Sequence, residues 1–578
     1  MNCPSRNDDT DRHPHWNQNP PALTADLTTR ADLNGIANTR ELDGAEHSNQ
    51  SDKEQDKSPR DAAISRAERP AGAEQEQEKE PGRKAFTLSS APQEDPHGKT
   101  SFTHFAAQCT RRLREILTKY SRFIGPGFLI AVAYIDPGNY ATDVNAGAAT
   151  RFAHLFIVLM SNLFAIFLQT LCIRLGSVTG LNLAENCRKH LPRWLVIILY
   201  IFSESAIIAT DIAEVIGSAI ALNLLLHIPL IAGCAITLVD VFVILIFYRP
   251  NGSMLHIRIF EYFVMALVLG VVVCFCIQLS YIQNTSVGQV FRGYLPSAEV
   301  VRGNGVYLSC GILGATVMPH SIFLGSGVVQ SRLRQFDVNA GTVDAPTAAD
   351  DSKSLDEKYR PSIAAIKSCL HYSVVELAFS LFTFALFINS AILITAGAWL
   401  YNNSEAAEAD LFGIHNLLST TIAPIAGTLF ALALLLSGTS AGIVCTIAGQ
   451  MVSEGMLNWS VRPWLRRLLT RSISIVPSVI VAGAVGRQGL NDALTASQVA
   501  LSVILPFVTA PLIYFTCRSH IMTVITAPSE NDAREGETGS AGVNMRNGWI
   551  VTIFAVLIWL VLVVMNVALL VLVGLGKA

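Results

Sequence analysis

From Phe123 onward the chain alternates between long apolar runs and short polar connections, whereas residues 1–100 contain almost no apolar run. Each run has about 20 residues, the length of helix that crosses the hydrocarbon core of a bilayer. Within lipid, an open chain satisfies its backbone hydrogen bonds only as a helix, so the pattern predicts an all-α membrane protein. The eleven predicted transmembrane helices are 123–149, 153–176, 195–224, 228–248, 257–282, 304–331, 366–398, 414–450, 472–488, 493–517 and 548–575.

Composition divides the chain further. Residues 1–110 are rich in Asp, Glu, Gln, Ser and Lys and bury too little apolar surface to offset chain entropy, so we expect a disordered tail. This tail is a candidate for ubiquitin ligation or for action by a kinase. Residues 111–525 form the predicted ten-helix core, with a flexible loop at 332–365, and residues 526–578 form a linker and the eleventh helix. The first residues lack a signal-peptide pattern, so we expect no cleaved leader.

Positive charge alternates between the connections. Lys and Arg gather in "TRRLREILTKYSR" before the first span, in "CRKHLPR" after the second and in "VRPWLRRLLTR" after the eighth, whereas "LHIP" and "WLYNNSEAAEADLF" have none. Basic loops stay in the cytoplasm, so we predict a cytoplasmic N-terminus and cytoplasmic loop 332–365, with the C-terminus on the far side. The sequence does not choose between the plasma membrane and a vacuolar or endosomal membrane.

The first span is interrupted by "DPGN". Asp136 is costly at membrane depth, and Pro137 and Gly138 open the helix, which is tolerable where the backbone lines a polar cavity. Asn139 adds an amide oxygen, so the segment suggests a cation site. Alternatively, Asp136 could simply end the span, but Phe123–Ile135 alone would give only about 20 Å of helix.

The sixth span is interrupted by "GATVMPHS", five spans after the first. Pro319 frees carbonyls near Gly314 and Ala315, and Met318 supplies a soft sulfur that suits first-row transition metals better than Mg²⁺ or Ca²⁺. A lone methionine is more often a packing residue, and His320 could carry a proton or serve a structural hydrogen bond. Paired breaks predict inverted repeats of helices 1–5 and 6–10 around a site at the midplane.

The third span carries three carboxylates on one helix face, Glu204, Asp211 and Glu214. Such residues commonly mark a proton relay, but they could also form a structural ion pair, for which Arg471 is a candidate.

Other polar residues within the spans, Gln169, Asn389 and Gln498, are more often interhelical hydrogen-bond partners than ligands. Gln498 gains weight because the tenth span packs near the site in inverted-repeat transporters.

These motifs, with "IATDIAEVIGSAIALNLL", "SGTSAGIVCTIAGQMVSEG" and "RRLLTRSISIVPS", resemble the NRAMP family of divalent-metal/proton symporters, most closely its fungal members, over roughly 123–525. The resemblance implies a LeuT-like fold with broken helices 1 and 6. It implies metal ligation by Asp136, Asn139, the Ala315 carbonyl, the Met318 sulfur and, in some states, Gln498. It implies a proton pathway through Asp211 and Glu214, with Glu204, His320 and Arg471 nearby.

One departure from the family pattern concerns helix 6. Many members have a second histidine five residues after the first, in "LHS", whereas this chain has Gly325, in "LGS". Any role of that histidine is therefore absent here. Relatives that carry magnesium lack the methionine, so Met318 argues against that branch.

The expected function is proton-coupled transport of Mn²⁺, with Fe²⁺ also carried and Co²⁺, Cd²⁺ and Zn²⁺ not excluded, into the cytosol by alternating access. The expected partners are the metal ion, the proton and the lipid bilayer, with no nucleic acid and no permanently bound cofactor. A sodium-coupled amino-acid carrier would have Asp136 repelling the substrate carboxylate. An intramembrane metalloenzyme would need a motif such as H-E-x-x-H, which the chain lacks. A receptor with a vestigial core would not need intact metal ligands.

Overall fold

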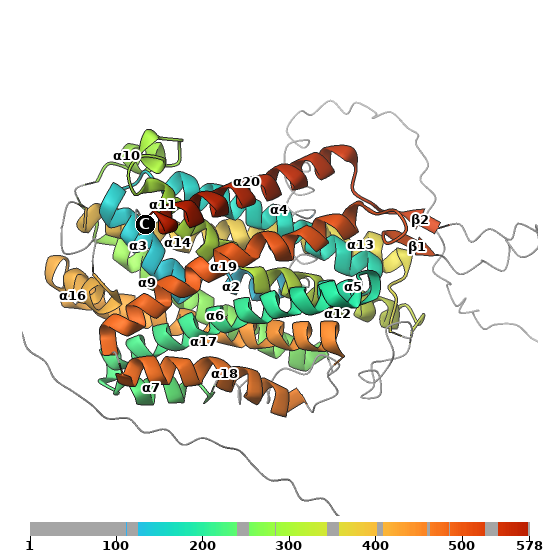
Figure 1. Ribbon diagram of the computed structural model, residues 1–578, viewed down its shortest axis with the longest axis horizontal. Coiled ribbons are helices and arrows are strands. Elements are labelled where there is room, and N and C mark those ends of the chain that lie inside the picture. The colour runs from blue at the N-terminus through green and yellow to red at the C-terminus, as the bar shows by residue number, and fades with distance from the viewer. Residues whose placement is uncertain are drawn as a thin grey trace, which may run out of the picture. The chain divides into compact units, whose positions relative to one another are not determined.

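The computed structural model describes the helical core and parts of its connections (Figure 1). The described residues are 111, 125–239, 254–283, 285–343, 358–401, 409–458, 463–484, 486–525 and 542–575. The predicted disordered tail, residues 1–110, therefore lies outside them, as do residues 344–357 of the predicted flexible loop.

Helices dominate the described part of the chain. They are α2 (Pro126–Val132), α3 (Pro137–Thr150), α4 (Leu155–Thr179), α5 (Leu183–His190), α6 (Arg193–Leu226), α7 (Leu230–Ile236), α9 (Met254–Ser280), α10 (Val287–Gly293), η1 (Ala298–Val300), α11 (Gly305–Thr316), α12 (Pro319–Asn339), α13 (Ile363–Ser380), η3 (Leu381–Ala385), α14 (Leu386–Trp399), α16 (Leu411–Thr421), α17 (Pro424–Leu457), α18 (Pro463–Ala484), α19 (Gly486–Cys517) and α20 (Trp549–Gly574). Within the described residues, β1 (Thr523–Ile525) pairs antiparallel with β2 (Gly542–Asn544), with Thr523 opposite Asn544.

The predicted helical class and both predicted helix breaks are confirmed. The first span consists of α2 and α3, and the sixth consists of α11 and α12. Eight helical segments in the described part are long and apolar enough to cross a membrane by length and composition. The first span is divided between α2 and α3, the ninth is among the shorter apolar helices, and the fourth lies partly outside the described residues, so the count of eleven stays a prediction.

Three boundaries were wrong. The predicted span 414–450 is two helices, α16 and α17, because Pro424 begins a new helix after an extended Ala423. The ninth span begins at Pro463 instead of 472, since the basic segment before it is helical and not a loop. The loop at 332–365 is shorter than predicted: α12 continues to Asn339, and Asp337 accepts hydrogen bonds from the Tyr359 hydroxyl and the Ser362 backbone.

Packing places the broken helices inside the bundle. In the most apolar 18-residue stretch of the α11–α12 span 94% of the residues are buried, against 28% in α20. α6 packs on α17, α18 and α19, and α20 lies against α19 and α11 (Figure 1). The exposed side chains of α20 are almost all apolar, as expected for a helix facing lipid.

Candidate functional site

The first break ends in a carboxylate that is held by the start of α3. Asp136 has an extended backbone, and its Oδ1 accepts hydrogen bonds from the backbone N of Asn139 at 3.0 Å and from Asn139 Nδ2 at 2.8 Å. Pro137 is the first residue of α3, where its missing N–H loses no helical hydrogen bond. The "DPGN" sequence thus folds so that a fully buried carboxylate caps the helix.

Three buried oxygens at this break accept no hydrogen bond from the described chain: Asp136 Oδ2, Asn139 Oδ1 and Gln498 Oε1. The amide of Asn139 donates to the Tyr134 carbonyl at 3.0 Å, which leaves its oxygen unused. Gln498 reaches the break from α19, because a Cβ built on Gly138 would lie only 2.1 Å from its Nε2. Buried carboxylate and amide oxygens need a partner, and at this break a cation or a water molecule would supply one.

The second break presents a sulfur and backbone carbonyls. Val317 and Met318 leave the helical conformation, with ψ of 85° and 125°, and α12 starts at Pro319. Pro319 has no N–H, so it cannot bond the carbonyl of Ala315 as a continuous helix would. Ala315 and Met318 are fully buried, and Ser321 Oγ donates to the Met318 carbonyl at 2.7 Å.

Hydrogen bonds join the two breaks. The Tyr134 hydroxyl lies 2.9 Å from Ser321 Oγ, and Gln169 Nε2 donates to the Tyr134 hydroxyl and to the Ser321 carbonyl, each at 2.9 Å. Asn389 Nδ2 donates to the Tyr134 carbonyl at 3.1 Å. These contacts bring the two breaks together in the bundle. The set of one carboxylate, neutral oxygens and one thioether suits a divalent transition metal.

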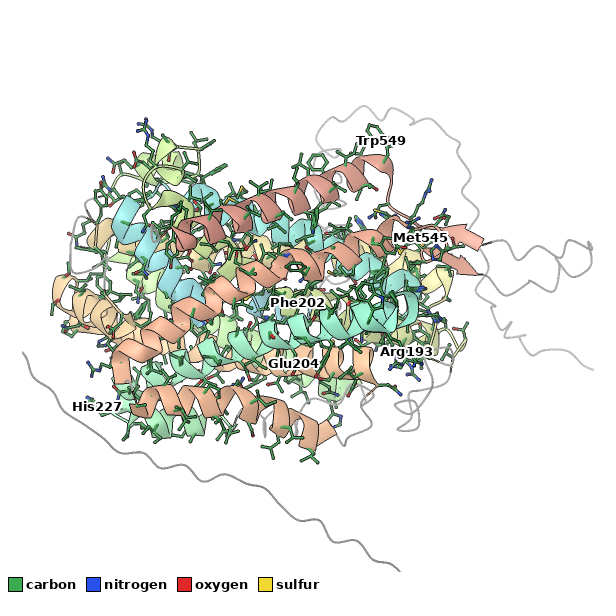
Figure 2. The ribbon with its side chains drawn as sticks, viewed as in Figure 1. Arg193, Phe202, Glu204, His227, Met545 and Trp549 are labelled. Atoms are coloured by element: carbon green, nitrogen blue, oxygen red, sulfur yellow. The ribbon has the colours of Figure 1, made fainter. Side chains whose placement is uncertain are left out.

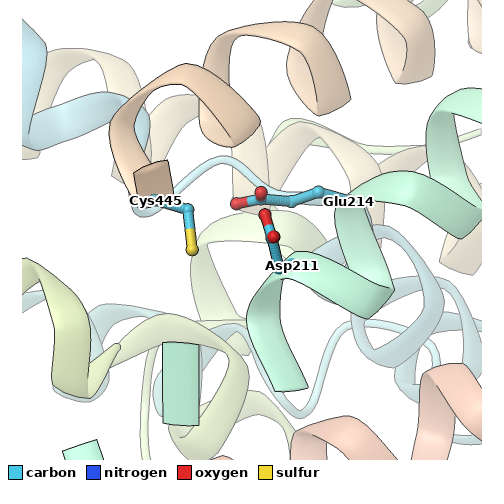
Figure 3. Close-up of side chains that lie close together, drawn as sticks. All are labelled: Asp211, Glu214 and Cys445. Carbon is cyan, nitrogen blue, oxygen red and sulfur yellow. The ribbon is translucent and has the colours of Figure 1, made fainter. Parts of the chain in front are cut away.

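A second polar cluster lies on α6, α17 and α18 (Figure 3). Arg471 forms an ion pair with Asp211 and lies 3.5 Å from Oε2 of Glu214. Ser474 donates to Asp211, and the Cys445 thiol and both carboxylates lie within 4.8 Å of one another. The ion pair that the sequence leaves as an alternative is therefore present, with every member buried.

His320 lies between the two groups. Its Nδ1 is 3.4 Å from the hydroxyl of Thr210, which directly precedes Asp211, and its Nε2 is buried without a hydrogen bond from the described residues. Glu204 lies on α6, as Asp211 and Glu214 do, but nearer the start of the helix (Figure 2). It is half-buried and lies outside the group of Asp211, Glu214 and Cys445. The structure thus brings Asp211, Glu214 and Arg471 together, and His320 contacts Thr210, the residue next to Asp211.

Sequence reasoning missed a network at the start of α2. Glu376 Oε1 accepts hydrogen bonds from the backbone N of Gly125 at 2.7 Å and of Gly127 at 3.1 Å, and Arg332 pairs with Glu261 at 2.9 Å. The sequence did contain a sign of this network, because Glu261 and Glu376 both lie within predicted transmembrane spans, where a charged side chain needs a partner. Their partners could not be read from the sequence.

A cavity of about 60 Å³ lies beside the first break, between α3, α11, α19 and α20. This volume exceeds the roughly 10–15 Å³ that one water molecule needs, so the cavity can hold water. Its polar lining includes Thr142, Asn145, Tyr307, Gln498 and Ser502. Gln498 therefore contacts both the first break and this cavity.

A helical membrane bundle in which two broken helices meet at buried, unbonded oxygens is the architecture of a secondary transporter. The family model described as "Natural resistance-associated macrophage protein-like" matches residues 127–530. The chain therefore belongs to the Nramp family, whose members are membrane transporters and not enzymes.

Similar proteins support this assignment. The chain is 54% identical over 493 residues to the manganese transporter SMF1 of Saccharomyces cerevisiae, covering 79% of this chain and 86% of the relative. It is 48% identical over 464 residues to the iron transporter SMF3 of the same yeast, covering 78% and 95%. A crystal structure of the Eremococcus coleocola manganese transporter has a TM-score of 0.64 at 31% identity and covers 82% of this chain and 88% of its own. The predicted LeuT-like fold is confirmed by this likeness.

Proposed function

We propose that the protein transports divalent transition-metal ions, Mn²⁺ first and Fe²⁺ as well, together with protons into the cytosol. The observation that carries the proposal is the set of three buried oxygens without a hydrogen-bond donor at the first break, beside the break that holds Met318. The names of the relatives, which include manganese and iron transporters, support the choice of metal.

The metal ion is the transported substrate. Asp136 supplies the negative charge, and Asn139 and the Ala315 carbonyl supply neutral oxygens. Met318 supplies a sulfur that Ca²⁺ and Mg²⁺ use poorly, which favours softer ions. Gln498 can follow the ion toward the cavity, because its amide oxygen is uncommitted and its helix borders both places.

The proton is carried by a different group of residues. Asp211 and Glu214 together have two negative charges against the single positive charge of Arg471, so the cluster is neutral once it holds one proton. His320 offers an intermediate position, since it lies between the second break and Thr210. Glu204, nearer the start of α6, would serve as an exit residue. Because the metal ion and the proton would use different residues, one proton could be carried with each metal ion without binding to a metal ligand.

Alternating access would use the two halves of each broken helix. The cavity reaches Gln498 from one end of the bundle, whereas Glu376 holds the start of α2 closed at the other. The positive-charge pattern of the loops supports a cytoplasmic position for the Glu376 end. Release of the metal ion would then require the hydrogen bonds from Gly125 and Gly127 to break. The membrane would be the plasma membrane or a vacuolar or endosomal membrane.

The test is a panel of ions presented to purified protein in proteoliposomes. Mn²⁺, Fe²⁺, Co²⁺ and Cd²⁺ should enter, and Mg²⁺ and Ca²⁺ should neither enter nor compete. Empty liposomes and protein with Asp136→Asn serve as controls. Uptake of Ca²⁺ as fast as Mn²⁺, or no uptake of any transition metal by folded protein, would contradict the proposal.

A further inference from the structure

Gly325 occupies a position that the backbone does not require to be glycine. It lies inside α12 and is not among the residues with positive φ. Yet a Cβ built on Gly325 would lie 1.9 Å from Oε1 of Gln169 and 3.3 Å from Cβ of Cys172. The absence of a side chain at this position therefore makes room for the amide of Gln169.

The amide of Gln169 holds both helix breaks. Its Nε2 donates to the Tyr134 hydroxyl at 2.9 Å, to Ser321 Oγ at 3.0 Å and to the Ser321 carbonyl at 2.9 Å. Tyr134 lies two residues before Asp136, and Ser321 Oγ donates to the Met318 carbonyl at 2.7 Å. The fully buried side chain of Gln169 therefore connects the segment that carries the Asp136 carboxylate with the segment that carries the Met318 sulfur. It does so from α4, a helix without a break.

The two observations are coupled through the planar amide group. A Cβ at position 325 would push Oε1 of Gln169 by about 1 Å to reach the 3.0 Å below which real Cβ contacts essentially never occur. Because Oε1 and Nε2 belong to one rigid plane, Nε2 would move as well and lose part of its hydrogen bonding to Tyr134 and Ser321.

We propose that Gln169 is a positioning residue for the metal site and that Gly325 gives it the space to act. This inference rests on the proposed function. At Gly325 the amide of Gln169 on α4 approaches α12 directly. The network is neutral, so it orients the ligands without adding charge to the site.

A double-mutant cycle tests the pair. Gly325→Ala alone and Gln169→Ala alone should each raise the KM for Mn²⁺ by about tenfold, as expected when hydrogen bonds that orient a ligand are lost, with a smaller change in the maximal rate. With Gln169→Ala present, adding Gly325→Ala should be neutral or beneficial, because only the 3.3 Å contact with Cβ of Cys172 then remains and Ala favours a helix over Gly. The sign of the Gly325→Ala effect therefore reverses between the two backgrounds.

Gly483→Ala is the matched control, because a Cβ there meets its nearest neighbour at an ordinary 3.4 Å. It should leave the KM unchanged. Equal harm from Gly325→Ala in both backgrounds would overturn the inference, as would Gln169→Ala protein with an unchanged KM. If wild-type protein transports no metal, the proposed function fails instead. The melting temperatures of wild type, the two single variants and the double variant then still test the steric contact between position 325 and Gln169. The effect of Gly325→Ala on the melting temperature should reverse its sign when Gln169→Ala is present.

Discussion

Replacing Asp136 by Asn removes the charge of the metal site and little else. Asn caps a helix as well as Asp does, and its oxygen can accept the two hydrogen bonds from Asn139 that Oδ1 accepts now. The variant should therefore fold. A control for folding is an unchanged elution volume and a melting temperature within a few degrees of wild type.

The magnitude follows from the charge alone. Two unit charges 4 Å apart at an effective dielectric constant of 20 attract by about 4 kcal/mol. We keep this single-charge figure for a divalent ion, since desolvation of the carboxylate offsets part of the doubled attraction. A loss of about 4 kcal/mol is about three powers of ten in affinity. Mn²⁺ uptake into proteoliposomes at micromolar concentration should fall to the level of empty liposomes, and a KM within threefold of wild type would refute the assignment of Asp136.

Three further substitutions test the sulfur ligand, the proton route and the tie at the start of α2 one at a time. Met318→Ala should retain Mn²⁺ uptake better than Cd²⁺ uptake and let Ca²⁺ compete, measured as inhibition of Mn²⁺ flux; unaltered rejection of Ca²⁺ would count against a role for the sulfur. Asp211→Asn should uncouple metal entry from proton entry, read by a pH-sensitive dye inside the liposomes, and an unchanged proton flux would contradict the proposed route. Glu376→Ala should free the start of α2, lowering the melting temperature by several degrees, from the roughly 1–3 kcal/mol lost when buried donors lose their acceptor. An unchanged melting temperature would argue against a tie at this end.

The local sequence was sufficient to predict both helix breaks. A carboxylate followed by Pro and Gly inside an apolar run has few stable outcomes in lipid, and the structure shows Asp136 capping α3 as the chemistry requires. The same holds for Pro319, which begins α12 after an extended Met318. These features depend on contacts within a few residues, so they are legible without the fold.

Contacts between distant parts of the chain could not be predicted from the sequence. Glu376 bonds backbone groups 251 and 249 positions away, and no pattern in the sequence announces this. Gly325 stood out only as a departure from the family, and its meaning required the position of Gln169 in space. Arg471 was expected at the start of a span because a basic, amphipathic helix resembles a basic loop when only charge is counted.

The central claim is that a transition metal enters with a proton through separate groups of residues. Simultaneous recording of Mn²⁺ and internal pH in proteoliposomes that contain the wild-type protein tests it most directly. Adding Mn²⁺ outside should acidify the interior as the metal enters, and an imposed inward proton gradient should speed Mn²⁺ uptake. Mn²⁺ entry with no acidification, at a rate indifferent to the gradient, would contradict it.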